Sequence, residues 1–179
     1  MTVAPRERLA QARRGGLRWL DVDIDRQELR LMAGVQVLQS FPVSTALNGP
    51  GERRGSECTP RGLHRIRLRI GEGRPPNTVF VARRPTGEIY HPELARREAD
   101  RDWILTRILW LTGLEPGRNR GGEVDSLRRF IYIHGTPDEV PMGQPASHGC
   151  IRMRNADIIA LFDQVANGML VDIREGSND

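Results

Sequence analysis

The residues best suited to covalent chemistry lie in two short segments of the C-terminal third. Ile133-His134-Gly135-Thr136 is followed by Ser147-His148-Gly149-Cys150. A cysteine attacks as a thiolate, and a nearby imidazole is a common means of generating one near neutral pH. Gly149 has no Cβ, so the backbone before Cys150 can turn tightly and direct N–H groups at a developing oxyanion. The two segments together indicate a thiol-dependent catalytic loop.

The hydrophobic pattern around these segments predicts the elements that hold them. Residues 129–134 are apolar on both faces, which favours a central strand with His134 at its end. Asn155 is predicted to cap a helix that Gly168 terminates. The apolar stripe of this helix comprises Ile158, Ile159, Phe162 and Val165.

The rest of the chain reads mainly as strands and loops. Seven further strands are predicted at 17–24, 28–32, 35–43, 63–70, 78–82, 102–111 and 168–173. Arg65, Arg67 and Arg69 are expected on the outer face of one of them. Long loops are expected at 48–56 and 113–122, a turn at 83–87 and a short helix at 92–99. Eight strands with little helix predict a mainly β fold, a mixed sandwich or barrel capped by short helices.

The amino-acid composition limits the classes of protein to which this chain can belong. A chain of 179 residues with 28% charged residues suits one globular domain, and no apolar run is long enough to span a membrane. All 27 basic residues are arginine, and the net charge is +4. Because no basic cluster is interleaved with aromatic residues, nucleic-acid binding is not supported, whereas a small acidic substrate is compatible.

The N-terminal residues bear on localisation. Residues 1–16 are arginine-rich and are expected to form a tail or short helix ahead of a domain at 17–174. Charges stand at Arg6, Glu7 and Arg8, where a signal peptide needs apolar residues. We therefore expect a cytoplasmic protein, or a periplasmic or cell-wall one if a signal has been removed.

The catalytic segments resemble a known family. His-Gly-Thr followed by Ser-His-Gly-Cys-Ile-Arg-Met is similar to the signature of the L,D-transpeptidase (YkuD-type) catalytic domain. Residues 41–45 with 59–62, and residues 155–157 with 168–173, look like further parts of that domain. The resemblance implies the family's fold, a mixed β structure capped by short helices.

The resemblance also implies roles for individual residues. Cys150 would be the nucleophile and His134 its base, with the Gly135 carbonyl holding the second imidazole nitrogen. The backbone N–H groups of His148, Gly149 and Cys150 are candidates for the oxyanion hole, and Ser147 and His148 are expected to shape the loop and contact substrate. Arg152 is expected either to tie the loop down or to bind a substrate carboxylate. No cofactor is implied.

The resemblance implies peptidoglycan stem tetrapeptides as substrates. Cys150 would attack the carbonyl of the third residue, a diamino acid, and release the terminal D-alanine. Water would then give L,D-carboxypeptidase action, and an amine would give a 3→3 cross-link. Because no export signal is seen, we expect carboxypeptidase action on soluble muropeptides during murein recycling, with wall cross-linking as the alternative. β-Lactams, carbapenems above all, are expected to acylate Cys150.

Two other interpretations compete with this one. The chain would be a binding module for peptidoglycan peptides if it had lost activity, although Cys150 and His134 are both present. A zinc site would use His134, His148 and Cys150, with Cys58 or His64 as a further ligand. The spacings do not match structural zinc patterns. The sequence assigns no role to Cys58, His64, Arg107 or Arg154, and it leaves Arg107 as either a cation at a rim or one in the cleft.

Overall fold

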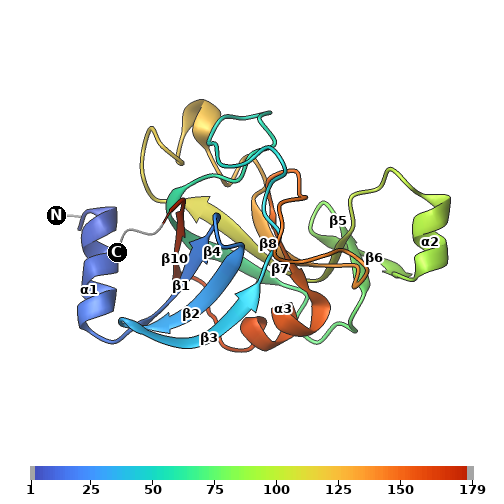
Figure 1. The fold of residues 1–179 in the computed structure, drawn as a ribbon, viewed down its shortest axis with the longest axis horizontal. Coiled ribbons are helices and arrows are strands. Elements are labelled where there is room, and N and C mark those ends of the chain that lie inside the picture. Colours follow the sequence, from blue (N-terminus) through green and yellow to red (C-terminus); the bar gives the residue numbers. More distant parts are fainter. Residues whose placement is uncertain (1–2, 177–179) are drawn as a thin grey trace.

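The computed structural model describes residues 3–176, which fold as one curled, mainly β sheet with helices around it (Figure 1). The main path runs β3-β2-β1-β10-β4-β7-β5-β6, with β8 paired to β7 and β9 paired to β8. The strands are β1 Arg18–Asp23, β2 Glu28–Ala33, β3 Gln36–Pro42, β4 Gly62–Ile70, β5 Thr78–Val81, β6 Arg84–Ile89, β7 Ile104–Gly113, β8 Tyr132–Thr136, β9 Ile151–Arg154 and β10 Leu170–Arg174. The prediction of a mainly β fold is confirmed.

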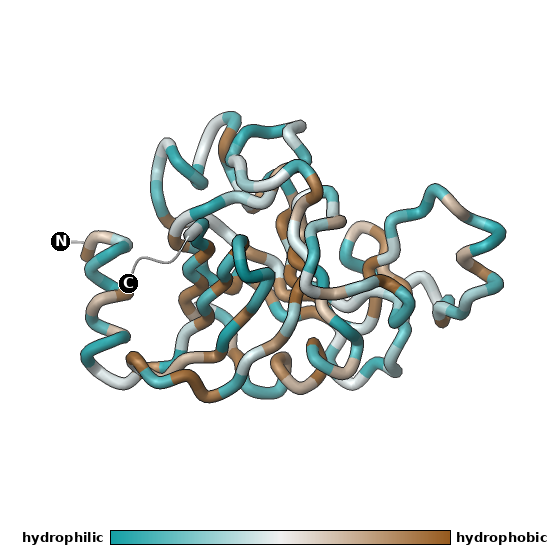
Figure 2. Tube along the Cα trace, viewed as in Figure 1, coloured by the Kyte–Doolittle hydropathy of each residue, from teal (hydrophilic) through white to brown (hydrophobic). Residues whose placement is uncertain are grey.

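The core lies between the curled sheet and the helix α3 (Asn155–Phe162). Ile158, Leu161 and Phe162 are buried on this helix, which packs against β7, β8 and β9. Figure 2 shows hydrophobic residues gathered along the central strands and hydrophilic ones on the outer loops. No helix among the described residues is long and apolar enough to cross a membrane.

The predicted ends of this helix were wrong. Arg154, not Asn155, occupies the N-cap position, and no side chain caps the helix. The Asn155 side chain turns into the protein instead, where it contacts Thr106, Asn77 and Asp138. The helix ends at Phe162, well before Gly168, whose positive φ of 90° belongs to the turn that leads into β10.

The N-terminal segment forms the helix α1 (Pro5–Arg14), which packs on the sheet. Its buried residues Leu9 and Ala12 join a cluster with Trp19, Met32 and Leu63. Arg6 adds ion pairs to Glu115 at 2.8 Å and to Asp172 at 2.9 Å.

Two strands are absent from the sequence prediction. The segment expected as a turn at 83–87 is largely β6, which forms a hairpin with β5. The second is β9, which begins directly after Cys150. Two short helical segments, α2 (Pro92–Arg97) and η1 (Gly122–Val124), complete the described elements.

The pairing of β4 with β7 is irregular. A register shift between Ile66 and Leu68 interrupts the alternation, so that Leu68 is 39% exposed. Arg65 and Arg67 are exposed as predicted, whereas Arg69 is half-buried over the Phe162 ring at 4.1 Å. A second shift, between Leu105 and Ile108, occurs where β7 pairs with β8, close to His134.

Candidate active site

The register of β8 and β9 places the candidate catalytic residues on one face of the sheet. The two strands are parallel, with Ile133 opposite Ile151 and His134 opposite Arg152. Ile133 and Ile151 are buried in the core. Because side chains alternate along a strand, His134 and Arg152 point to the other face. Cys150, which directly precedes β9, packs against the cluster of Ile108 and Tyr132.

His134 is held by one ring nitrogen and keeps the other without a partner. The residue is fully buried, and its Nδ1 lies 2.7 Å from the Gly135 carbonyl oxygen. A carbonyl only accepts hydrogen bonds, so Nδ1 carries the proton and Nε2 is left as an acceptor. Within residues 3–176, Nε2 is buried and has no hydrogen-bond partner. Burial lowers the pKa of His134, so the imidazole is neutral near pH 7.

Cys150 is a protonated thiol in this arrangement. Its Sγ lies 3.4 Å from the Phe130 carbonyl oxygen and accepts the Tyr132 N–H at 3.3 Å. Burial raises the pKa of Cys150 to about 12, although the Tyr132 hydrogen bond opposes the shift. The site therefore holds a neutral thiol and a neutral imidazole, rather than the ready thiolate that the sequence suggests.

The Ser-His-Gly-Cys loop is fixed by its own serine. The buried Ser147 donates from Oγ to the Cys150 carbonyl at 2.5 Å and accepts the Gly149 N–H at 3.2 Å. Gly149 has a φ of +126°, and a Cβ there would lie 3.2 Å from the Cys58 carbonyl oxygen. The turn into Cys150 therefore requires glycine.

Residues 44–47 form a brace along this loop. Ser44 and Arg152 exchange two backbone hydrogen bonds of 2.9 Å, and Ser147 donates its N–H to the Thr45 carbonyl at 2.9 Å. The buried Gln27 side chain holds Thr45 in turn, through hydrogen bonds of 2.6 and 2.9 Å. Residues 44 and 45, which the sequence marked only as part of a family-like segment, thus hold the Ser-His-Gly-Cys loop in place.

A second loop, residues 48–59, contacts the Ser-His-Gly-Cys loop and the segment before β8. Arg129 donates to the carbonyls of Gly51, Glu52 and Cys58, and Thr59 donates from Oγ1 to the Gly149 carbonyl at 2.9 Å.

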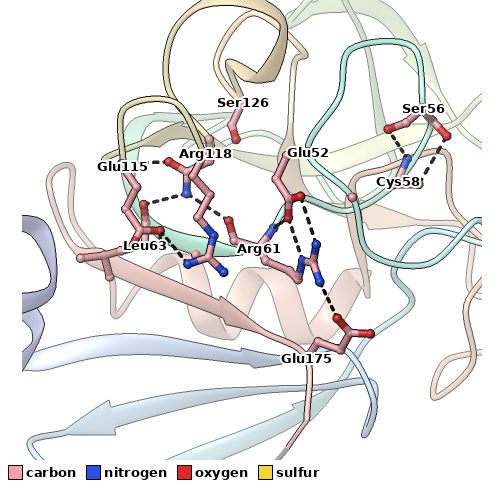
Figure 3. A network of polar contacts seen from close by, with 12 residues as sticks. Glu52, Ser56, Cys58, Arg61, Leu63, Glu115, Arg118, Ser126 and Glu175 are labelled. Atoms are coloured by element: carbon pink, nitrogen blue, oxygen red, sulfur yellow. Dashed lines mark hydrogen bonds and ion pairs between the residues drawn. The ribbon is translucent and has the colours of Figure 1, made fainter.

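The base of that loop is anchored by Arg61. Figure 3 shows Arg61 between Glu52 and Glu175, with ion-pair distances of 2.8 and 2.6 Å. The neighbouring Glu115 accepts the Leu63 N–H and pairs with Arg118 (Figure 3). The loop that carries Cys58 is therefore tied to β4 and β10.

A cleft of about 330 Å³ opens beside the catalytic loop. Its lining includes Asp102, Thr136, His148 and Arg152. His148 is exposed, whereas Arg152 is mostly buried and pairs with Asp102 at 3.0 Å while donating to the Ala146 carbonyl. These contacts favour the loop-tying role of Arg152. A larger cleft of about 890 Å³ lies beside α1. Neither His134 nor Cys150 is among the residues that line either cleft, but His148 and Arg152 of the smaller one flank Cys150 in the sequence.

Gly135 sits where no side chain fits. A Cβ there would lie 2.5 Å from Asn155 Oδ1 and 2.6 Å from the Leu105 carbonyl oxygen. Thr106, which is buried with a φ of +73°, donates from Oγ1 to the same Asn155 oxygen at 2.5 Å. A β-branched residue in this region is strained, and such strain is concentrated at functional sites.

Four residues to which the sequence assigned no role are placed by the structure as follows. His64 is buried between the Gly62 carbonyl and Ser126 Oγ, and burial lowers its pKa to about 4. Cys58 is a free thiol that donates to loop carbonyls. Arg107 is buried against the carbonyls of Arg74 and Thr106, and Arg154 is exposed.

The zinc interpretation finds no support in this geometry. Among residues 3–176, no three His, Cys, Asp or Glu side chains are grouped as a metal site would require.

Four residues of the site were not identified from the sequence: Asp102, Thr106, Phe130 and Tyr132. Their positions near the site depend on pairing between strands that are distant in the sequence.

Comparisons with known proteins agree with this fold. A sequence profile of the L,D-transpeptidase catalytic domain (YkuD) matches residues 17–173. The putative L,D-transpeptidase YkuD of Bacillus subtilis is 44% identical over 59 residues, 32% of this chain and 36% of the relative. The crystal structure of an L,D-transpeptidase from Xylanimonas cellulosilytica superposes with a TM-score of 0.56 at 18% identity, covering 88% of this chain and 60% of that one.

A second solved structure, L,D-transpeptidase LdtMt1 in complex with imipenem, gives a TM-score of 0.52 at 17% identity. It covers 88% of this chain and 58% of that one. The fold is thus that of an L,D-transpeptidase catalytic domain. The chain belongs to the L,D-transpeptidase catalytic domain (YkuD) family. Its matches span only about a third to three fifths of these relatives' lengths.

Proposed function

We propose that this protein transfers acyl groups from peptidoglycan stem tetrapeptides through Cys150, with His134 as general base and the Gly135 carbonyl as its orienting partner. The observation that carries the proposal is the buried, unpartnered Nε2 of His134 on the face that holds Cys150. A buried polar atom without a partner is costly, and a catalytic role accounts for its retention.

The first half of the reaction forms a thioester. The Cys150 sulfur attacks the carbonyl carbon of the third-residue diamino acid while His134 Nε2 takes the thiol proton. Because both groups are neutral at rest, proton transfer accompanies the attack. The Gly149 N–H already donates to Ser147 Oγ, so the backbone N–H groups of His148 and Cys150 are the ones that would receive the oxyanion. The imidazolium returns the proton to the departing D-alanine amine.

The second half removes the acyl group. An incoming water or amine loses its proton to His134 as it attacks the thioester, and the thiol of Cys150 is restored. We favour water, and hence L,D-carboxypeptidase action. The cleft beside the loop, about 330 Å³, is at the lower end of ligand sites, about 300–1,000 Å³, and would hold one peptide segment.

The test is product analysis with purified protein and a tetrapeptide. Tripeptide and D-alanine should appear with little cross-linked dimer, even at high substrate concentration. Abundant dimer would replace the carboxypeptidase assignment by that of a cross-linking enzyme. No turnover by a correctly folded protein, together with measurable peptide binding, would make the chain a binding module.

Variants test the residue roles. Cys150→Ala and Cys150→Ser should abolish D-alanine release without unfolding the protein, because a serine hydroxyl paired with this imidazole lacks thiol nucleophilicity. His134→Ala should reduce turnover far more than His148→Ala, since only His134 acts as base. A larger loss with His148→Ala would exchange the two assignments.

β-Lactams provide a chemical probe of the same thiol. Imipenem, which is bound in a related solved structure, should form a one-to-one covalent adduct with this protein. Its strained amide carbonyl would take the place of the scissile carbonyl. Peptide mapping should locate the adduct on Cys150, and a label on Cys58 would contradict the assignment.

A further inference from the structure

Three residues other than glycine have a left-handed backbone conformation in the β5–β6 hairpin and in the segment before β8. Ala82 and Arg83 form the turn of the β5–β6 hairpin with φ of 46° and 65°, and Phe130 has φ of 56° next to Cys150. None of them is glycine, so each conformation is disfavoured. Strained residues persist where the surrounding structure holds them, often at functional sites.

The strained turn aims the Arg83 side chain at the neighbours of Cys150. Its guanidinium donates to Tyr132 Oη at 3.1 Å and stacks over the rings of Trp110 at 4.4 Å and Phe130 at 5.1 Å. Tyr132 and Phe130 are the residues whose backbone groups contact Cys150 Sγ. Arg83 is thus linked to the reacting sulfur through these two residues, whose side chains it contacts and whose backbones contact Cys150.

Arg83 differs from the other arginines around the site in keeping most of its hydrogen-bond donors free. Arg152 is already paired with Asp102, and Arg129 is engaged by loop carbonyls. Within residues 3–176, Arg83 has no carboxylate partner, and only one of its five N–H donors is used. The flanking rings fix the plane of the guanidinium and leave its remaining donors available.

We propose that Arg83, held by Tyr132, Trp110 and Phe130, is an anion-binding residue that anchors a carboxylate of the substrate next to Cys150. A fixed, half-buried guanidinium binds a carboxylate through two parallel hydrogen bonds and discriminates against an amide. The assignment to a peptide carboxylate rests on the proposed function. The carboxylate is either that of the terminal residue or that on the third-residue side chain.

The first experiment needs no peptide. In a Cys58→Ser background, Cys150 is alkylated with iodoacetate and with iodoacetamide, and the ratio of the two rates is measured. Both reagents react with the Cys150 thiolate, so a change in the fraction of thiolate alters both rates equally and cancels in the ratio. Arg83→Gln should lower it about threefold or more, as expected from the loss of one nearby positive charge. Arg84→Gln, at an exposed neighbouring position of the same hairpin, is the matched control and should leave the ratio unchanged.

Two conservative variants refine this result. Arg83→Lys keeps the charge and should retain most of the preference for iodoacetate. Tyr132→Phe removes one hydrogen bond to the guanidinium and should lower the preference by less than Arg83→Gln does. An unchanged ratio in a folded Arg83→Gln protein would overturn the inference.

The second experiment identifies the carboxylate. For the tetrapeptide, Arg83→Gln should raise KM about tenfold with little change in kcat, which is the effect of losing uniform binding. The same comparison is made with a peptide amidated at its C-terminus and with one amidated on the third-residue side chain. The substitution should have no effect on the peptide that lacks the recognised carboxylate.

The two experiments separate the two claims. If the alkylation ratio falls but no peptide is turned over, the anion site stands and the proposed function fails. If every peptide is turned over equally by both proteins and the ratio is unchanged, the function stands and the role of Arg83 is refuted.

Discussion

The protonation state of the resting site leads to the prediction with the largest measurable effect. Burial raises the pKa of Cys150 to about 12, against an ordinary value of 9.0, and lowers the pKa of His134. The difference corresponds to about a thousandfold less thiolate at any pH well below 9. Cys150 should therefore react slowly with small alkylating agents near pH 7, even though the site contains His134.

The assay follows iodoacetamide alkylation by intact mass between pH 6 and 10. Cys58→Ser is used as the background because Cys58 is also a free thiol. The logarithm of the rate should rise with pH at a slope of about one and reach no plateau. His134→Ala should change this profile by less than about threefold, because the imidazole does not stabilise a resting thiolate, yet it should abolish turnover.

Two results would contradict this prediction. A plateau near pH 7, or a large fall in neutral-pH alkylation in His134→Ala, would show that a thiolate–imidazolium pair exists at rest. That outcome would refute the concerted proton transfer proposed for the first step.

Three further perturbations follow from the structure. Gly135→Ala places a Cβ 2.5 Å from Asn155 Oδ1, so it should destabilise the fold by about 1–3 kcal/mol in urea titrations and lower kcat about a hundredfold by moving the His134 orienting carbonyl. His64 has a folded pKa of about 4 below its unfolded value of 6.5, so the unfolded chain binds the proton first as pH falls. Stability should decline from about pH 6.5 to 4, by up to about 3 kcal/mol, and His64→Asn should flatten this part of the pH profile. Cys58→Ser keeps a hydrogen-bond donor for the loop carbonyls and should change both stability and turnover little; a large loss of turnover alone would give Cys58 a catalytic role.

The fold was largely predictable because several strands, among them β7 and β8, are largely buried runs that the sequence marks as apolar. The apolar run at 129–134 contains most of the central strand β8. By contrast, β6 is exposed at nearly every position and contains Pro85 and Gly87, so no hydrophobic alternation marks it. Its strand character depends on pairing with β5, which a local pattern does not record.

The site was predictable in its residue types but not in its electrostatics. The spacing of His134 and Cys150 suggested a base and a nucleophile, but the raised pKa of Cys150 arises from burial that only the folded sheet creates. Asn155 fits the local preference for a helix cap, yet tertiary contacts with Thr106 redirect its side chain. The Arg83 position depends on a hairpin turn with no glycine at its centre, which the usual turn signals do not indicate.

Covalent catalysis by Cys150 is the central claim about this protein, and one measurement tests it directly. Purified protein is mixed with tetrapeptide, quenched in acid within the first turnovers and analysed by intact mass and peptide mapping. We predict a thioester of the tripeptide on Cys150, formed together with free D-alanine and absent from Cys150→Ala. D-Alanine release by Cys150→Ala, or an acyl adduct on any other residue, would contradict the account.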